Sequence, residues 1–261
     1  MDPATIAGLG IAVTAIVAAI FIEGSSPMSI LLPAPMILVL VGTLGAAIAG
    51  GTMRDAKNAA KALPRAFTGK PKGSEEAIAT IVSLAERARR EGLLALEDSA
   101  KDIDDDFLRD GLRGAIDGTD PEDLRVILED KIAAKRAADR VGANFFTQMG
   151  GYAPTIGIVG TVVSLVHVLE NLSEPEELGN LIAAAFVATF WGIASANIAF
   201  LPIGNRLKRL SELECAQMEI VVEGLLSVQA GANPRVVGER LRSLVPPDQV
   251  EKPGKSDKAA A

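Results

Sequence analysis

Long apolar stretches without charge alternate along the chain with stretches rich in charged residues. The uncharged stretches are Pro3–Ile22, Gly24–Met53, Val141–Leu169 and Leu178–Asn205. About 20 apolar residues span the hydrocarbon core of a bilayer, and a helix satisfies every backbone polar group within that core. We therefore predict four transmembrane helices. Their predicted centres are Thr5–Ile22, Ile30–Ala49, Phe146–His167 and Leu181–Ile203.

The charged stretch between the second and third spans has the pattern of several helices. Ser74 is a predicted cap for a helix whose apolar residues recur at helical spacing and which Gly92 ends. Asp120 and Pro121 are typical of an N-cap and a first helical position, and acidic residues follow them. Nothing breaks this later helix before Gly150, so we predict that it runs directly into the third span as a rigid rod.

These patterns predict an all-α integral membrane protein with four transmembrane helices and a helical cytoplasmic domain between the second and third. Neither a β-pattern nor an internal repeat stands out. The predicted segments are 1–53 (transmembrane helices 1 and 2), 54–140 (cytoplasmic helical domain), 141–205 (transmembrane helices 3 and 4) and 206–261 (a cytoplasmic C-terminal helix and a disordered tail from 245).

The basic residues predict the orientation of the spans. Of the 26 Lys and Arg residues, 17 lie in 54–140 and 9 in 206–261, so both segments and both termini are expected in the cytoplasm. The first span lacks the basic start and the cleavage site of a signal peptide, so we expect it to stay in the membrane. Cys215 then lies in a reducing compartment without a disulfide. A pI near 4.9 argues against nucleic acid as a partner.

The residue inventory gives little support for an enzyme or for a bound cofactor. One His, one Cys and no HExxH, CxxC or P-loop pattern leave no metal, thiol or phosphate site to build. His167 falls at the outer end of the third span, where we interpret it as an interfacial residue rather than a proton carrier.

Small and hydroxyl residues form stripes on three of the predicted spans. On the second, they let helix backbones approach closely. In an antiparallel pair of the third and fourth spans, Thr161 and Thr189 fall at similar depth. The stripes either pack the helices together or line a shared cleft, and the sequence leaves both open. Their members are Gly42, Ala46 and Gly50; Pro154, Gly157, Thr161 and Ser164; and Ala185, Thr189, Gly192 and Ala196.

The four spans contain no carboxylate, although ion-coupled membrane proteins carry such groups for transport. Either the chain moves no ions, or the helix of a partner brings the titrating acid to the threonine-lined face.

The chain resembles the motility protein A family (MotA and its sodium-driven relative PomA), the larger stator subunit of the bacterial flagellar motor. The resemblance covers about residues 3–230. Its most specific part includes the paired Pro154 and Pro202, a PxxGxxGT pattern and a fourth span that starts "LGNLIAAAFVATFWG". A further match is "RREGLLALE", which begins at Arg89 and ends at Glu97.

The resemblance implies a function, a location and a set of partners. A single-span, peptidoglycan-anchored motility protein B would supply the ion-binding Asp, and a ring of this chain, expected to be a pentamer, would surround it in the inner membrane. Proton or sodium flow would then drive torque. The implied ion-pathway residues are Pro154, Gly157, Thr161, Thr189 and Pro202. Arg89 and Glu97 would face the rotor switch protein FliG, although both also fit an ordinary solvated helix face.

Two other functions fit parts of the pattern. Energisers of the ExbB and TolQ type share the use of a partner's Asp but usually have three spans. A stand-alone four-span transporter would need its own intramembrane acid. Four spans and the missing acid disfavour them.

Overall fold

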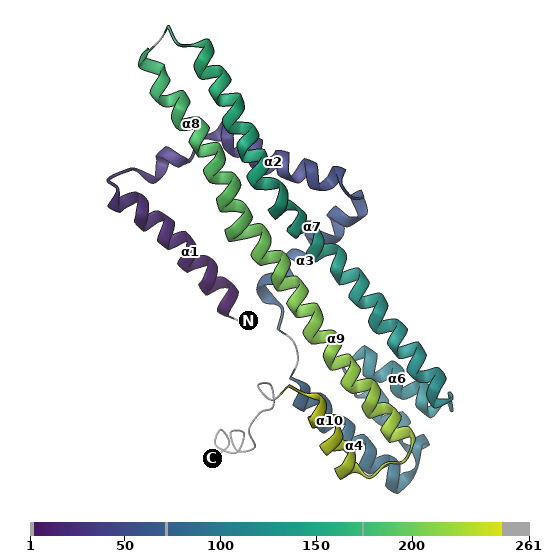
Figure 1. Cartoon of the computed structure of the whole chain (residues 1–261). Coiled ribbons are helices and arrows are strands. Elements are labelled where there is room, and N and C mark those ends of the chain that lie inside the picture. Colours follow the sequence, from purple (N-terminus) through teal and green to yellow (C-terminus); the bar gives the residue numbers. More distant parts are fainter. Residues whose placement is uncertain (1–2, 71–72, 174, 247–261) are drawn as a thin grey trace. The chain divides into compact units, whose positions relative to one another are not determined.

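The computed structural model describes residues 3–70, 73–173 and 175–246, and these ranges are helical with short connections and contain no strand (Figure 1). Residues 247–261 of the predicted tail lie outside them. The elements are α1 (Pro3–Ile22), the 3-10 helix η1 (Pro27–Ile30), α2 (Pro33–Ala49), α3 (Met53–Thr68), α4 (Ser74–Glu91), the 3-10 helix η2 (Leu93–Ala95), α5 (Leu96–Lys101), α6 (Asp106–Ile116), α7 (Pro121–Glu170), α8 (Pro175–Ala194), the π-helical turn η3 (Ser195–Phe200), α9 (Leu201–Gln229) and α10 (Pro234–Leu244).

The chain divides into two compact units. Unit 1 comprises Met1–Lys70 and Ala138–Leu210, and unit 2 comprises Pro71–Ala137 and Ser211–Ala261. The predicted continuity of the helix that starts at Pro121 is confirmed, because α7 runs for 50 residues and contributes to both units. Asp120 caps it as predicted, with its carboxylate accepting a hydrogen bond of 2.9 Å from the Glu122 amide.

Three helical segments are long and apolar enough to cross a membrane: Thr5–Ile22, α7, and the run from Pro175 to Gln229. The second predicted span is shorter than expected. It starts at Pro33 instead of Ile30, and α2 has 17 residues. Proline fits the first turn of a helix because the amide there has no intrahelical acceptor, so Pro33 fixes the start. A crossing by α2 therefore stays a prediction.

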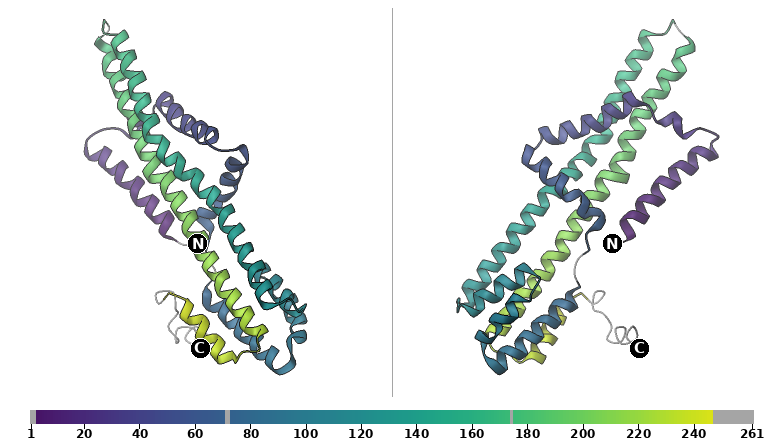
Figure 2. Two further views of the ribbon diagram at one scale, coloured as in Figure 1. Left: turned by 45° about the vertical axis from the view of Figure 1, so that its right-hand side comes forward. Right: turned by 180° about the vertical axis from the view of Figure 1, so that it is seen from behind.

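Unit 1 centres on an antiparallel hairpin of α7 and α8, which lie side by side in all three views (Figures 1 and 2). α2 packs against α8, and α1 contacts the rest of the unit at η1, η3 and α3. The alanines of the amphipathic α3 pack in a cluster with Phe145 and Phe146 of α7 and Leu207 of α9. An ion pair of 2.6 Å between Arg65 and Asp139 fixes α3 to α7.

Unit 2 is a helical bundle around leucines and isoleucines that are almost fully buried, among them Ile78, Leu112 and Leu225. The α7 and α9 segments are joined by three ion pairs of 2.6–2.8 Å: Arg125–Glu223, Lys135–Glu214 and Arg136–Glu219. The hydrogen bond from the Arg125 guanidinium to Glu223 raises the pKa of Arg125. The Lys131 ammonium lowers the pKa of the Asp110 carboxyl on α6 in the same way.

One cap prediction in this unit is wrong. Ser74 is the first residue of α4, the cap position belongs to Gly73, and no side chain caps the helix there. Two glutamates in the first turn, Glu75 and Glu76, favour the helix start through the helix dipole instead. The predicted end of α4 at Gly92 is confirmed, since Gly92 has a φ of 87° that only glycine adopts without strain.

Candidate functional site

The backbones of α7 and α8 touch at a pair of glycines. A Cβ atom added to Gly157 would lie 2.9 Å from the carbonyl oxygen of Ala188 and 3.1 Å from the Cα of Gly192. A Cβ added to Gly192 would lie 2.7 Å from the carbonyl oxygen of Ala153. Because the obstructing atoms belong to the backbone, they have no rotamer with which to move aside. Glycine at both positions is what allows this approach.

The close approach brings the two threonine hydroxyls together. Thr161 Oγ1 contacts Thr189 Oγ1, so the two threonines lie at similar depth, as the sequence predicts. Thr161 also donates to the carbonyl oxygen of Gly157, at 3.1 Å, or of Ala185, at 2.9 Å. Both threonines are half-buried. Two hydroxyls and two carbonyl oxygens thus form an uncharged cluster of oxygen atoms between two stretches that carry no Asp, Glu, Lys or Arg, 141–169 and 178–205.

Pro154 lies inside α7 and faces the same contact. Its Cα would be 3.3 Å from a Cβ added to Gly192. Proline has no amide hydrogen, so the α7 hydrogen-bond ladder lacks one donor at this turn. One turn earlier, a Cβ added to Gly150 would lie 2.5 Å from the side chain of Leu201, so the helices also pack closely there.

Pro202, the second proline implied by the resemblance, lies away from the threonine pair. It follows the π-helical turn η3, where the Leu201 amide donates to the carbonyl of Ala196, five residues back. Its ring lines a cleft between α1 and α9. The structure thus brings together four of the five implied ion-pathway residues, and Pro202 is the exception.

Three polar residues of the hairpin and its neighbours were not predicted from the sequence. Trp191 Nε1 donates to the carbonyl of Ile30 at 2.6 Å and fixes α8 to the end of η1. Ser195 is buried and bonds the carbonyl of Gly192 at 3.4 Å. Thr43 on α2 is fully buried, with no hydrogen-bond partner among the described residues. Of these three residues, only Ser195 could have been found from the sequence, because it follows Gly192 by three residues.

The implied rotor-facing pair lies in unit 2 on either side of a sharp turn. Arg89 is in the last turn of α4 and Glu97 in the first turn of α5, with Gly92 between them. Both side chains are exposed, and neither forms an ion pair with a described residue. Exposed charge of this kind suits a binding surface and an ordinary solvated surface equally well.

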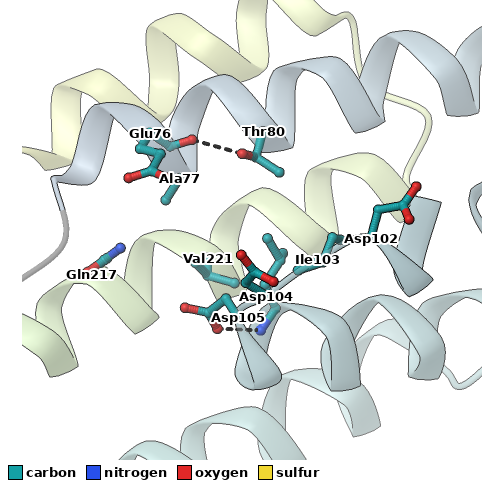
Figure 3. A pocket seen from close by; sticks show the side chains of 10 residues that line it. Glu76, Ala77, Thr80, Asp102, Ile103, Asp104, Asp105, Gln217 and Val221 are labelled. Carbon is teal, nitrogen blue, oxygen red and sulfur yellow. Dashed lines mark hydrogen bonds between the residues drawn. The ribbon is translucent and has the colours of Figure 1, made fainter.

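A cleft of about 220 Å³ on unit 2 is lined by residues of α4, α9 and the α5–α6 connection (Figure 3). Its carboxylates include Glu76, Asp102, Asp104 and Asp105. Asp105 is occupied as the N-cap of α6, accepting from the amides of Phe107 and Leu108 at 3.0 Å each. Within the described ranges, no group of three or more His, Cys, Asp or Glu side chains is arranged to hold a metal ion.

Comparison with known proteins assigns the hairpin and its surroundings to a family. Residues 99–220 match the model of the MotA/TolQ/ExbB proton channel family, and residues 6–92 match that of the motility protein A N-terminal region. Motility protein A of Bacillus subtilis is 36% identical over 247 residues, which are 94% of this chain and 92% of the relative. The chain belongs to the motility protein A family.

Solved structures agree with the family assignment. The flagellar MotAB stator complex from Bacillus subtilis matches with a TM-score of 0.87 and 36% identity, over 94% of this chain and 96% of that one. The structure of C. jejuni MotAB matches with a TM-score of 0.91 and 29% identity, over 97% and 100% of the two chains.

Membership in the motility protein A family settles several sequence predictions. The chain is a multi-pass membrane protein of a channel and stator family, not an enzyme. The match of residues 6–92 to the motility protein A N-terminal region decides against the ExbB and TolQ alternative, and the match to a proton channel family decides against a stand-alone transporter.

Proposed function

We propose that this chain is the multi-span subunit of a flagellar stator and encloses the single membrane helix of a MotB-type partner. The observation that carries the proposal is the Thr161–Thr189 contact between two stretches, 141–169 and 178–205, that have no carboxylate. Such an uncharged oxygen cluster lacks a titrating group. An acidic residue on a partner helix, packed against this face, would complete an ion site.

The proposed topology has four crossings with both termini in the cytoplasm. All Lys and Arg residues lie in 54–140 and 206–261, which supports a cytoplasmic position for these segments. α2 has 17 residues, which is at the short end of the roughly 17–25 that a spanning helix needs. In a bacterial cell this topology belongs to the inner membrane.

Five copies of the chain would form a ring around the partner in this proposal. Binding of a proton or sodium ion at the partner's Asp removes a buried charge, whose burial costs several kcal/mol, and so changes which packing of the ring is preferred. Each ion that enters delivers about 2.3 kcal/mol per 100 mV of membrane potential. Repeated neutralisation and release would turn the ring stepwise.

Each ion-pathway residue has a distinct role in this mechanism. Gly157 keeps the two backbones in contact, so that Thr161 and Thr189 present their hydroxyls at one depth. Pro154 leaves a carbonyl without its helical donor and allows the helix to bend. Pro202, next to η3, likewise has no amide donor and allows a bend, nearer the cytoplasmic end of the fourth span.

Torque would leave the stator through unit 2. Arg89 and Glu97, displayed on either side of the Gly92 turn, would contact charged groups of the rotor protein FliG. Their exposure leaves both side chains accessible to a rotor, as this assignment requires.

The test is ion flux into proteoliposomes that contain the chain alone or the chain with its partner. We expect vesicles with the chain alone to stay tight to protons and sodium, and vesicles with the partner to conduct. The control is the partner with its membrane Asp changed to Asn, which should close the pathway. A robust current through the chain alone would refute the proposal.

Motor rotation in cells decides the coupling ion, which the two hydroxyls leave open. A threonine oxygen is a ligand suited to sodium, but Thr161 also bonds its own helix carbonyl. Motor rotation that is unchanged at micromolar external sodium and fixed membrane potential would establish proton coupling. Sodium dependence that disappears in Thr161→Ala would establish sodium coupling.

A further inference from the structure

A cleft of about 440 Å³ separates α1 from the η3–α9 segment in unit 1. The α1 residues that line the cleft recur at helical spacing. The residues that line the opposite side lie on one face of the η3–α9 segment. The α1 residues are Thr5, Gly8, Leu9 and Ala12, and the opposite residues are Asn197, Ile198, Pro202 and Arg206. The Asn197 amide is already bonded to the carbonyl of Ile193 at 2.9 Å. The walls therefore present mainly apolar surface.

The cleft is open space along α1. A Cβ atom added to Gly8 would meet nothing within 4 Å. None of the residues from Thr5 to Ile22 is buried, although this is the most apolar helix of the chain. In a multi-pass membrane protein, an apolar cleft of this kind is filled by lipid chains or by another protein.

The mouth of the cleft carries a fixed positive charge. Arg206 is the first cation after the uncharged stretch that ends at Asn205, so it lies at the membrane boundary. Its guanidinium is half-buried and donates to the carbonyl of Gly69 at 3.2 Å, which holds it in place. A guanidinium has five N–H donors in a planar fork that matches a phosphate group.

The surface at this depth is basic, although the whole chain has a net charge of −7. Residues 54–70, 138–145 and 203–210 together contain nine Lys and Arg against two acids, Asp55 and Asp139. Three of the cations, Arg54, Lys57 and Lys61, recur at helical spacing on α3 and are exposed. Each cation near a membrane surface attracts anionic lipid.

We propose that this cleft binds an anionic phospholipid, with an acyl chain along Gly8 and Ala12 and the phosphate at Arg206. In the proposed orientation, the lipid belongs to the inner leaflet. The charge at the mouth favours lipid over a second copy of the chain. Both acids at this depth are already bonded in their own chain, Asp55 to the Thr52 amide at 2.9 Å and Asp139 to Arg65 at 2.6 Å. A neighbouring copy therefore offers no available carboxylate there from the described residues.

The experiment measures lipid retained by the purified full chain after extensive detergent washing, by native mass spectrometry. Phosphatidylglycerol and phosphatidylcholine with the same acyl chains are supplied separately. We expect retention of phosphatidylglycerol over phosphatidylcholine. Arg206→Gln should lower phosphatidylglycerol retention about fivefold, the effect of one cation at a membrane surface, and Arg206→Lys, which keeps the charge but lacks the planar fork, should lower it less. Gly8→Leu should lower retention of both lipids, because its side chain fills the cleft.

Two matched variants control for charge and for bulk. Arg235→Gln removes an exposed cation of unit 2 that lies outside these basic segments, and Gly10→Leu adds the same side chain to α1 outside the cleft. Both should retain lipid as the wild type does. Equal retention of the two lipids, wild-type retention in Arg206→Gln, or disulfide trapping of two chains through Gly8→Cys would overturn the proposal. No readout involves ion flow or torque, so the result is independent of the proposed stator function.

Discussion

At the scale of single residues, glycine decides how near the two hairpin helices come. Gly157 and Gly192 each occupy a place where a methyl group would overlap backbone of the facing helix. The Thr161–Thr189 contact depends on this spacing, because a threonine side chain is too short to bridge a wider gap. Changing these glycines therefore tests the geometry of the site without touching its oxygen atoms.

Gly157→Ala should destabilise the hairpin by about 1–3 kcal/mol, as overpacking does in other well-packed interiors. Gly151→Ala on the same helix is the matched control, since its added methyl meets nothing within 4 Å and removes glycine's unfavourable helix entropy. Its expected effect is neutral or stabilising by about 0.5–1 kcal/mol. Thermal unfolding of the two purified variants in detergent compares them. Equal stability of Gly157→Ala and wild type would contradict the close contact.

Pro154→Ala should leave assembly normal and slow or stop rotation, because alanine restores the missing helix donor and removes the bend that the proposed mechanism uses. The measurements are the amount of stator complex in the membrane and the rotation rate of tethered cells. Reduced assembly with normal torque per complex would instead make Pro154 a purely structural residue.

At the scale of elements, the turn between α4 and α5 sets which charges unit 2 displays. Gly92 ends α4 with a positive φ, and the chain re-enters a helix within a few residues. Arg89 and Glu97 are thereby held on two different helices near one turn. The sequence motif predicted this pair, and its interaction with a rotor stays a prediction.

Arg89→Glu or Glu97→Lys should impair swimming while membrane insertion and ion conduction stay normal, because both side chains are exposed on unit 2. Arg235→Glu is the matched control, since Arg235 is an exposed cation on α10 of the same unit. Partial rescue by opposite charges on FliG would identify the contact. Swimming that is unaffected by both reversals would return the pair to an ordinary solvated surface.

At the scale of the whole molecule, segregation of charge made much of the fold predictable. Uncharged stretches located the long apolar helices, and Asp120 with Pro121 located the start of α7. The matched depth of Thr161 and Thr189 followed from counting residues from the hairpin, since antiparallel helices with a short connection have similar rise. What was predicted correctly depends on spacing within one helix or one hairpin.

Features that join distant segments were not predictable from such spacing. The Arg125–Glu223 pair links residues 98 apart, and the Trp191 bond to Ile30 links residues 161 apart. The wrong cap at Ser74 has a local cause: a serine can cap a helix or begin one, and the first turn of α4 is favoured by its glutamates in either case. The alternatives differ by a single position.

The π-helical turn η3 bears on how the length of this chain can change. A π-helical turn holds one residue more than an α-helical turn and is equivalent to a single-residue insertion into an α-helix. Loss of one residue between Ser195 and Phe200 could therefore be absorbed as regular α-helix, with the segments on both sides keeping their faces towards their neighbours. Pro202 opposes this loss, because its ring would then press on the carbonyl one turn earlier. The extra residue and the proline are thus expected to be gained or lost together among relatives.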